Sequence, residues 1–111
     1  MSYLLQYVRR AASPARVDER IVLNLPNFDG GAHVRTYVED TTNRKIHRTP
    51  PEPRVKLRIA DCVNEVYLEF GVASPAAREN SLYKLNTLIA ALHRFRDALA
   101  AEADLYEQRE R

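Results

Sequence analysis

The chain has 111 residues, of which 45% are hydrophobic and 29% charged, and its formal net charge is +2. This length is typical of one domain, and the composition excludes a wholly disordered chain. A lone cysteine, Cys62, excludes an internal disulfide, and no apolar run is long enough to cross a membrane. We therefore expect a single domain over residues 1–111, with no membrane contact and a cytoplasmic location.

The charge is unevenly distributed along the chain. Residues 1–58 carry eleven Lys/Arg and six Asp/Glu, a balance of +5, whereas residues 59–111 carry six and nine, a balance of −3. Such asymmetry indicates either a half that faces an anion or two halves that attract each other in an assembly.

Residues 1–48 have mainly β character. Ile21–Leu25 is a short apolar run that ends at Pro26, and it predicts a strand. Alternating residues over 34–39, an interruption at 40–43 and a polar stretch over 44–48 predict a β-hairpin. Residues 2–10 fit both a strand and a helix; we favour the strand.

A proline-rich connector over 49–53 separates the two halves, and Pro53 is a suitable first helical residue. Val55, Ile59, Val66 and other apolar residues then share one helical face, which predicts a helix over 53–70 that ends before Gly71. Residues 54–59 also alternate with a period of two, so a last strand followed by a shorter helix is the alternative.

A second helix is predicted over 75–108, because Ser74 and Pro75 form a helix start and an apolar stripe follows at three- and four-residue spacing. The expected fold class is therefore α+β, a small N-terminal antiparallel sheet followed by a C-terminal αα-hairpin. The long helix would extend about 23 Å beyond the first helix. The apolar side chains of this extension must be buried by the sheet or by another protomer, which favours a homodimer.

No pattern in the chain indicates catalysis. The three histidines have no partner at a recognised zinc spacing, no glycine-rich phosphate loop occurs, and no nucleophile, base and orienting group can be assembled. On the predicted first helix, Cys62 would be a small core residue. We therefore expect a non-enzyme with no metal and no cofactor.

The strongest functional signal is the basic segment over 44–58, which holds six Lys/Arg and the single acid Glu52. Guanidinium groups near a helix N-terminus suit phosphate. Tyr37 could add stacking, and Arg35 and His33 could add polar contacts, if they share the same face. The expected function is a small oligomeric protein that binds nucleic acid or a nucleotide-type ligand. The predicted contacts are Arg44, Lys45, Arg48, Arg54, Lys56 and Arg58.

The alternative function is a protein–protein adaptor or inhibitor that uses the long helix. Large apolar side chains in the second half of this helix would anchor either a partner protein or a second protomer. These candidate interface residues are Leu92, Phe95, Leu99 and Tyr106.

Overall fold

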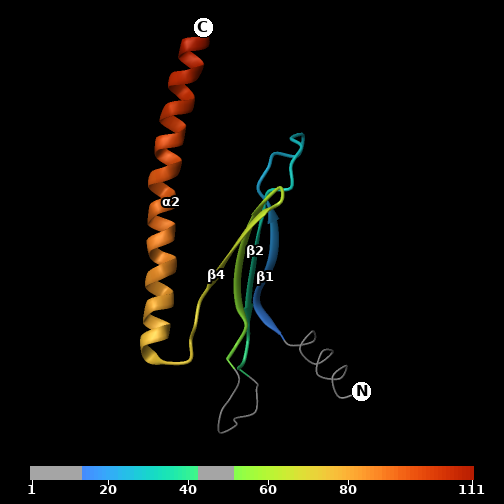
Figure 1. The fold of residues 1–111 in the computed structure, drawn as a ribbon, viewed down its shortest axis with the longest axis vertical. Coiled ribbons are helices and arrows are strands. Elements are labelled where there is room, and N and C mark those ends of the chain that lie inside the picture. The colour runs from blue at the N-terminus through green and yellow to red at the C-terminus, as the bar shows by residue number, and fades with distance from the viewer. Residues whose placement is uncertain (1–13, 43–51) are drawn as a thin grey trace.

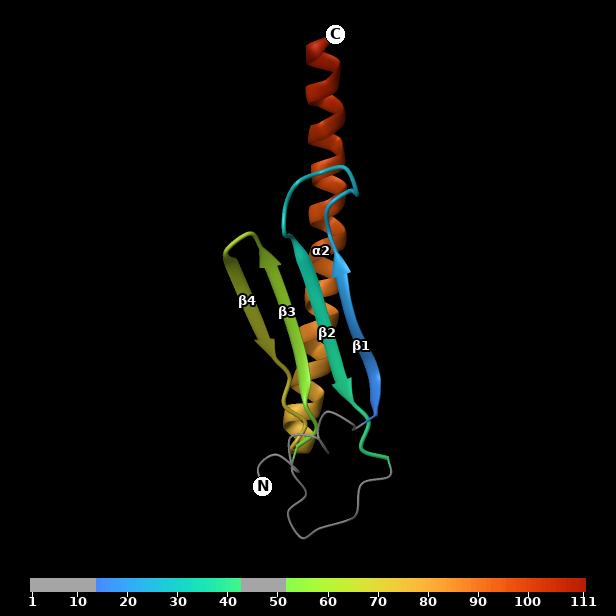
Figure 2. The same cartoon turned by 90° about the vertical axis from the view of Figure 1, so that its right-hand side faces the viewer.

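The computed structural model describes residues 14–42 and 52–111. Four strands form an antiparallel sheet in the order β1-β2-β3-β4, and one long helix, α2, follows them (Figures 1 and 2). The elements are β1 (Ala15–Val22), β2 (His33–Glu39), β3 (Val55–Asp61), β4 (Asn64–Glu69) and α2 (Pro75–Glu110). The α+β class, with the sheet before a long C-terminal helix, is confirmed.

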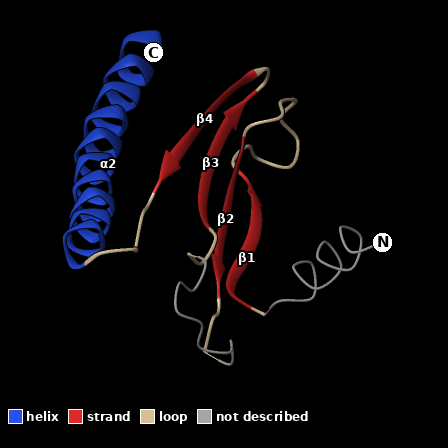
Figure 3. Cartoon of the chain, turned by 60° about the horizontal axis from the view of Figure 1, so that its bottom comes forward, coloured by secondary structure: helices blue, strands red, loops and turns tan. Residues whose placement is uncertain are grey.

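The predicted helix over 53–70 is wrong, because this segment forms the β3–β4 hairpin (Figure 3). Asp61 pairs with Asn64 across a two-residue turn, and the first turn residue, Cys62, has a φ of 56°. The apolar residues of 55–70 fit both helical and strand periods, and the strand pattern prevails because it aligns apolar residues with those of β2. The alternative is correct for the strand over 54–59, which corresponds to β3, and wrong for the shorter helix that was expected to follow it, because β4 occupies that place. The αα-hairpin is replaced by a β-hairpin followed by one helix.

The prediction of a strand over 34–39 is confirmed by β2, but its neighbours in the sheet are β1 and β3. Both the predicted hairpin partner over 44–48 and the segment 2–10 lie outside the described residues. The strand predicted over 21–25 begins earlier, at Ala15, and ends at Val22. Leu23 then bonds through its N–H to the Ala32 carbonyl at 2.9 Å, which starts the β1–β2 connection.

The long helix agrees with the prediction to within two residues, since α2 spans Pro75–Glu110. The Ser74 hydroxyl accepts a hydrogen bond from the Ala77 N–H at 3.1 Å, and proline occupies the first turn. The helix therefore begins with the N-cap and proline that the sequence indicates.

The sheet has one polar and one apolar face, because side chains alternate along each strand and the register aligns residues of the same kind. Among the described residues, Ala60 is the only hydrophobic residue that is buried, so the apolar face is largely open. We define the apolar sheet face by Val17, Ile21, Val34, Val38, Val55, Leu57, Ile59, Val66 and Leu68.

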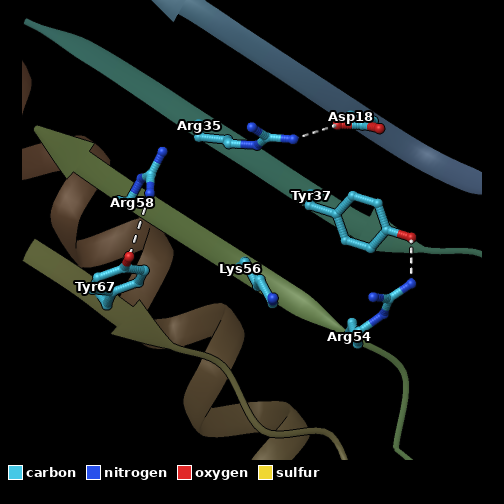
Figure 4. A pocket seen from close by; sticks show the side chains of 7 residues that line it. All are labelled: Asp18, Arg35, Tyr37, Arg54, Lys56, Arg58 and Tyr67. Carbon is cyan, nitrogen blue, oxygen red and sulfur yellow. Dashed lines mark hydrogen bonds and ion pairs between the residues drawn. The ribbon is translucent and has the colours of Figure 1, made fainter. Parts of the chain in front are cut away.

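The helix α2 lies on the side of the sheet opposite the polar side chains, and none of its residues is buried (Figures 2 and 4). Three side chains of its first turns donate hydrogen bonds to carbonyls at the end of β4 and in the link that follows. Ser81 Oγ bonds to the Gly71 carbonyl at 2.7 Å, and Lys84 Nζ bonds to the Glu69 carbonyl at 2.7 Å. Arg78 bonds to the Val72 carbonyl at 3.0 Å. The start of α2 is thus held by polar contacts to the link.

Within the described residues, no helix is both long and apolar enough to span a membrane.

Candidate functional site

Cations and tyrosines gather on the polar face of the sheet, at its centre. Because side chains alternate between the two faces along β3, Lys56 and Arg58 both lie on this face. In the register of β2 with β3, Tyr37 lies opposite Lys56, and Arg35 lies opposite Arg58. Residues that are about 20 positions apart in the chain therefore become neighbours on one surface (Figure 4).

Arg58 is held by a small hydrogen-bonded network with β4. Its Nη1 donates to the Tyr67 hydroxyl at 3.4 Å, and that hydroxyl donates to Glu65 at 3.3 Å. The guanidinium carbon lies 5.9 Å from the centre of the Tyr67 ring. The hydrogen bond to Tyr67 raises the pKa of Arg58 above its already high value, so this side chain stays cationic throughout the accessible pH range.

Arg54 and Tyr37 form a second pair at the other end of the cluster. Arg54 Nη2 donates to the Tyr37 hydroxyl at 3.3 Å, and its guanidinium carbon lies 5.2 Å from the ring centre. The backbone N–H of Arg54 donates to the buried Glu39 carboxylate at 3.0 Å. These contacts fix the start of β3 and the direction of the Arg54 side chain.

An open groove of about 310 Å³ runs between these side chains (Figure 4). Four cations and a single acid line it. Arg35 pairs with Asp18 at 4.0 Å, with both side chains half exposed, and Arg58 pairs at 4.0 Å with Glu65, which lies outside the lining. Such pairs are weak in water and leave the groove cationic. We call this surface the basic sheet face; its residues are Asp18, Arg35, Tyr37, Arg54, Lys56, Arg58 and Tyr67.

In the described part of the chain, two hydrogen-bond donors of the basic sheet face lack an acceptor. The Lys56 amine has no hydrogen-bond or ion-pair partner among residues 14–42 and 52–111, and the buried Nε of Arg58 has no acceptor within the same ranges. Glu69 lies opposite Lys56 in the register with β4. The arrangement can hold an anion, because planar guanidinium groups and a lysine amine converge on one open groove.

The structure brings together five of the residues that the sequence singled out. Arg54, Lys56, Arg58, Tyr37 and Arg35 all line the groove, whereas His33 does not. The other three predicted cations, in the segment 44–48, lie outside the described residues. The expected helix N-terminus beside these cations is absent from the described chain, because Pro53 leads into β3 and not into a helix.

Arg35 alternates with Tyr37 along β2, and its place opposite Arg58 depends on the register. Two other lining residues were missing from the predicted site. Tyr67 could not be found while 53–70 was assigned to a helix, since only the hairpin places it opposite Arg58. Asp18 was missed because the sequence predicted the first strand over 21–25, whereas β1 spans Ala15–Val22 and includes Asp18.

The candidate interface residues of the long helix are all solvent-exposed. Leu92, Phe95, Leu99 and Tyr106 have exposed fractions between 52% and 68%. Cys62 is also exposed, in the β3–β4 turn, so its prediction as a core residue is wrong. No group of three or more His, Cys, Asp or Glu that could hold a metal ion occurs among the described residues.

Comparisons of this chain with protein-family models, with curated proteins and with solved structures gave no match.

Proposed function

We propose that this protein is a non-catalytic binding protein that holds a phosphate-bearing partner on the basic sheet face. The observation that carries the proposal is the convergence of Arg35, Arg54, Lys56 and Arg58 on one open groove with a single acid in its lining. Phosphate oxygens are strong acceptors for such donors.

The spacing of the cations favours an extended polyanion as the partner. Arg54, Lys56 and Arg58 follow one strand at alternate positions, so their Cα atoms are about 6.6–6.8 Å apart. Tyrosine rings lie at both ends of the row, Tyr37 beside Arg54 and Tyr67 beside Arg58. A basic groove with aromatic rings on a sheet surface is the arrangement that single-stranded nucleic acids bind by backbone contact and base stacking.

The test is the binding of a fluorescein-labelled single-stranded oligonucleotide, followed by fluorescence anisotropy over a series of salt concentrations. If all four cations contact phosphates, the slope of log K against log salt is about −2.8, since each contact on a single strand contributes about −0.7. The double variant K56A/R58A removes two contacts, so the slope should fall to about −1.4.

A matched control keeps the same change in net charge. Arg94→Ala with Arg96→Ala removes two cations from α2, where Arg96 is 81% exposed and pairs only with its neighbour Asp97. We expect this control to bind as the unmodified chain does. Equal loss of affinity in both double variants would contradict a localised site, and no binding by the unmodified chain at low salt would refute the proposal.

A further inference from the structure

The chain exposes far more surface than a folded monomer of its size. Its accessible surface is 9864 Å², whereas a compact monomer of 12.8 kDa exposes about 6,300 Å². Its radius of gyration is 19.2 Å, against about 13 Å for a compact domain of this length. The excess of about 3,600 Å² is more than one protomer buries in a typical obligate dimer, where the total is about 2,000–5,000 Å².

Much of this exposed surface is apolar and lies on facing elements. On the apolar sheet face, Val66 is 57% and Ile21 is 46% exposed, and on α2 Leu92 is 52% and Leu99 is 59% exposed. Contiguous apolar surface of this extent indicates an interface. Within residues 14–42 and 52–111, neither the apolar sheet face nor α2 has a covering layer.

The sheet of the same chain is too short to supply the cover for α2. The helix has 36 residues and is about 54 Å long, whereas the longest strand has eight residues and spans about 27 Å. Figure 1 shows the C-terminal half of α2 extending past the ends of the strands. Residues such as Leu99 and Tyr106 therefore need another chain.

The apolar stripe of α2 has the spacing of a helix–helix seam. Leu85, Leu92 and Leu99 recur every seven residues, with Leu88 and Phe95 between them. Ile89 flanks this seam, and Leu82 flanks it about two turns earlier. The apolar arc is therefore wider than a contact between two helices requires. The same helix can thus contact a second helix and a sheet.

Charges along α2 favour an antiparallel arrangement of two such helices. Residues 75–96 contain four Lys/Arg and one acid, whereas residues 97–107 contain four acids and no Lys/Arg. An antiparallel pair places the acidic segment of one helix beside the basic segment of the other, whereas a parallel pair places like charges together. Leu92 lies at the middle of both the helix and the stripe.

We propose that the partner covering this apolar surface is a second copy of the chain. The two α2 helices run antiparallel along the seam with Leu92 near the twofold axis, and the far half of each helix covers the apolar sheet face of the other copy. The contact is then isologous, and each patch meets its own counterpart. The basic sheet face lies on the opposite side of the sheet and stays open.

The first test is the molar mass of the full chain by light scattering after size-exclusion chromatography at micromolar concentration. We expect twice the chain mass of 12.8 kDa. A monomer at this concentration would overturn the proposal. The apolar stripe of α2 would then be a binding surface for a different protein, as expected of an adaptor.

Cross-linking tests the geometry directly, because the cysteines that link identify the residues that face each other. In a Cys62→Ser background, single cysteines replace Leu85, Leu92 or Leu99, and a short bis-maleimide is added. The proposed axis predicts cross-links for Leu92→Cys alone and for a mixture of Leu85→Cys with Leu99→Cys, but none for Leu85→Cys or Leu99→Cys alone. Cross-linking of all three single variants would show parallel helices and refute the arrangement.

A charge in the seam should dissociate the dimer. Leu92→Glu places two carboxylates at the axis and removes two leucine contacts, so we expect the dimer dissociation constant to rise by at least about 100-fold. The control Ala101→Glu lies on the opposite side of the helix from Leu92 and should leave the dimer intact. Equal dissociation of both variants would contradict the proposed seam, and the cross-linking result stands even if Leu92→Glu does not fold.

Discussion

Replacement of Tyr67 separates stacking from charge on the basic sheet face. The Tyr67 ring is 61% exposed, and the Arg58 guanidinium lies 5.9 Å from the ring centre. The outer face of the ring is therefore available to a nucleic-acid base. A variant that removes the ring without removing a charge tests this contact alone.

The expected loss follows from the energy of one stacked base. Base–aromatic stacking contributes about 1–3 kcal/mol, so Tyr67→Ala should weaken oligonucleotide binding by about 5- to 150-fold. Tyr67→Phe keeps the ring and loses only the hydroxyl that bonds to Arg58 and Glu65, so its affinity should stay within about threefold of the unmodified chain.

The assay is the same anisotropy titration over several salt concentrations. Stacking releases no counterions, so the salt slope of Tyr67→Ala should equal that of the unmodified chain even though its affinity is lower. Tyr83→Ala makes the same change on α2, where Tyr83 is 69% exposed, and should not affect binding. A flatter slope for Tyr67→Ala, or an equal loss for Tyr67→Phe, would refute the stacking argument.

Three further predictions concern the sheet. Cys62→Gly should raise the free energy of unfolding by about 0.5–1 kcal/mol, because glycine adopts the positive φ of 56° without steric cost. Val63→Gly, in the same turn, should not raise it, and urea denaturation measures the free energy of unfolding of both variants. Glu39→Ala should destabilise by about 1–3 kcal/mol because it removes a buried acceptor, while Glu39→Gln keeps an acceptor and should lose less in the same assay. Hydrogen bonds from Thr42 lower the pKa of Asp40 below 3.8, so its contribution to stability is complete above that value and is lost as the pH falls through the lowered pKa. Acid titration of the unfolding free energy should therefore show a shallower fall below pH 4 for Asp40→Asn, and an unchanged profile would contradict this role.

The long helix could be predicted because its signals are local. Ser74 and Pro75 mark the start, and the apolar stripe continues without a break for most of its length. The strand β2 was equally visible, since its apolar residues alternate and both of its ends have turn residues.

The β3–β4 hairpin could not be predicted with the same ease, because its turn residues give no signal. Cys62 and Val63 replace the glycine or asparagine that such a turn normally contains. Apolar residues on both sides of the turn also fit a helical period, and only pairing with β2 decides between the two structures. A local pattern cannot encode that pairing.

The same limit applies to the candidate site. Three of its cations are close together in the chain and form a visible basic segment, whereas Arg35 and Tyr67 join them only through the register of β2, β3 and β4. Charge runs are readable from a sequence; a surface assembled across strands is not.

The meander order of the sheet has a consequence for the way the chain folds. Each strand pairs with the strand that precedes or follows it in the chain, so no strand crosses over another. Pairing between consecutive strands has a lower entropic cost of closure than pairing between distant segments and favours fast folding. The sheet can therefore form within a single chain, hairpin by hairpin, before the proposed association of two chains, which depends on concentration. Folding kinetics measured at several protein concentrations would then show a fast phase that is independent of concentration and a slower phase that is not.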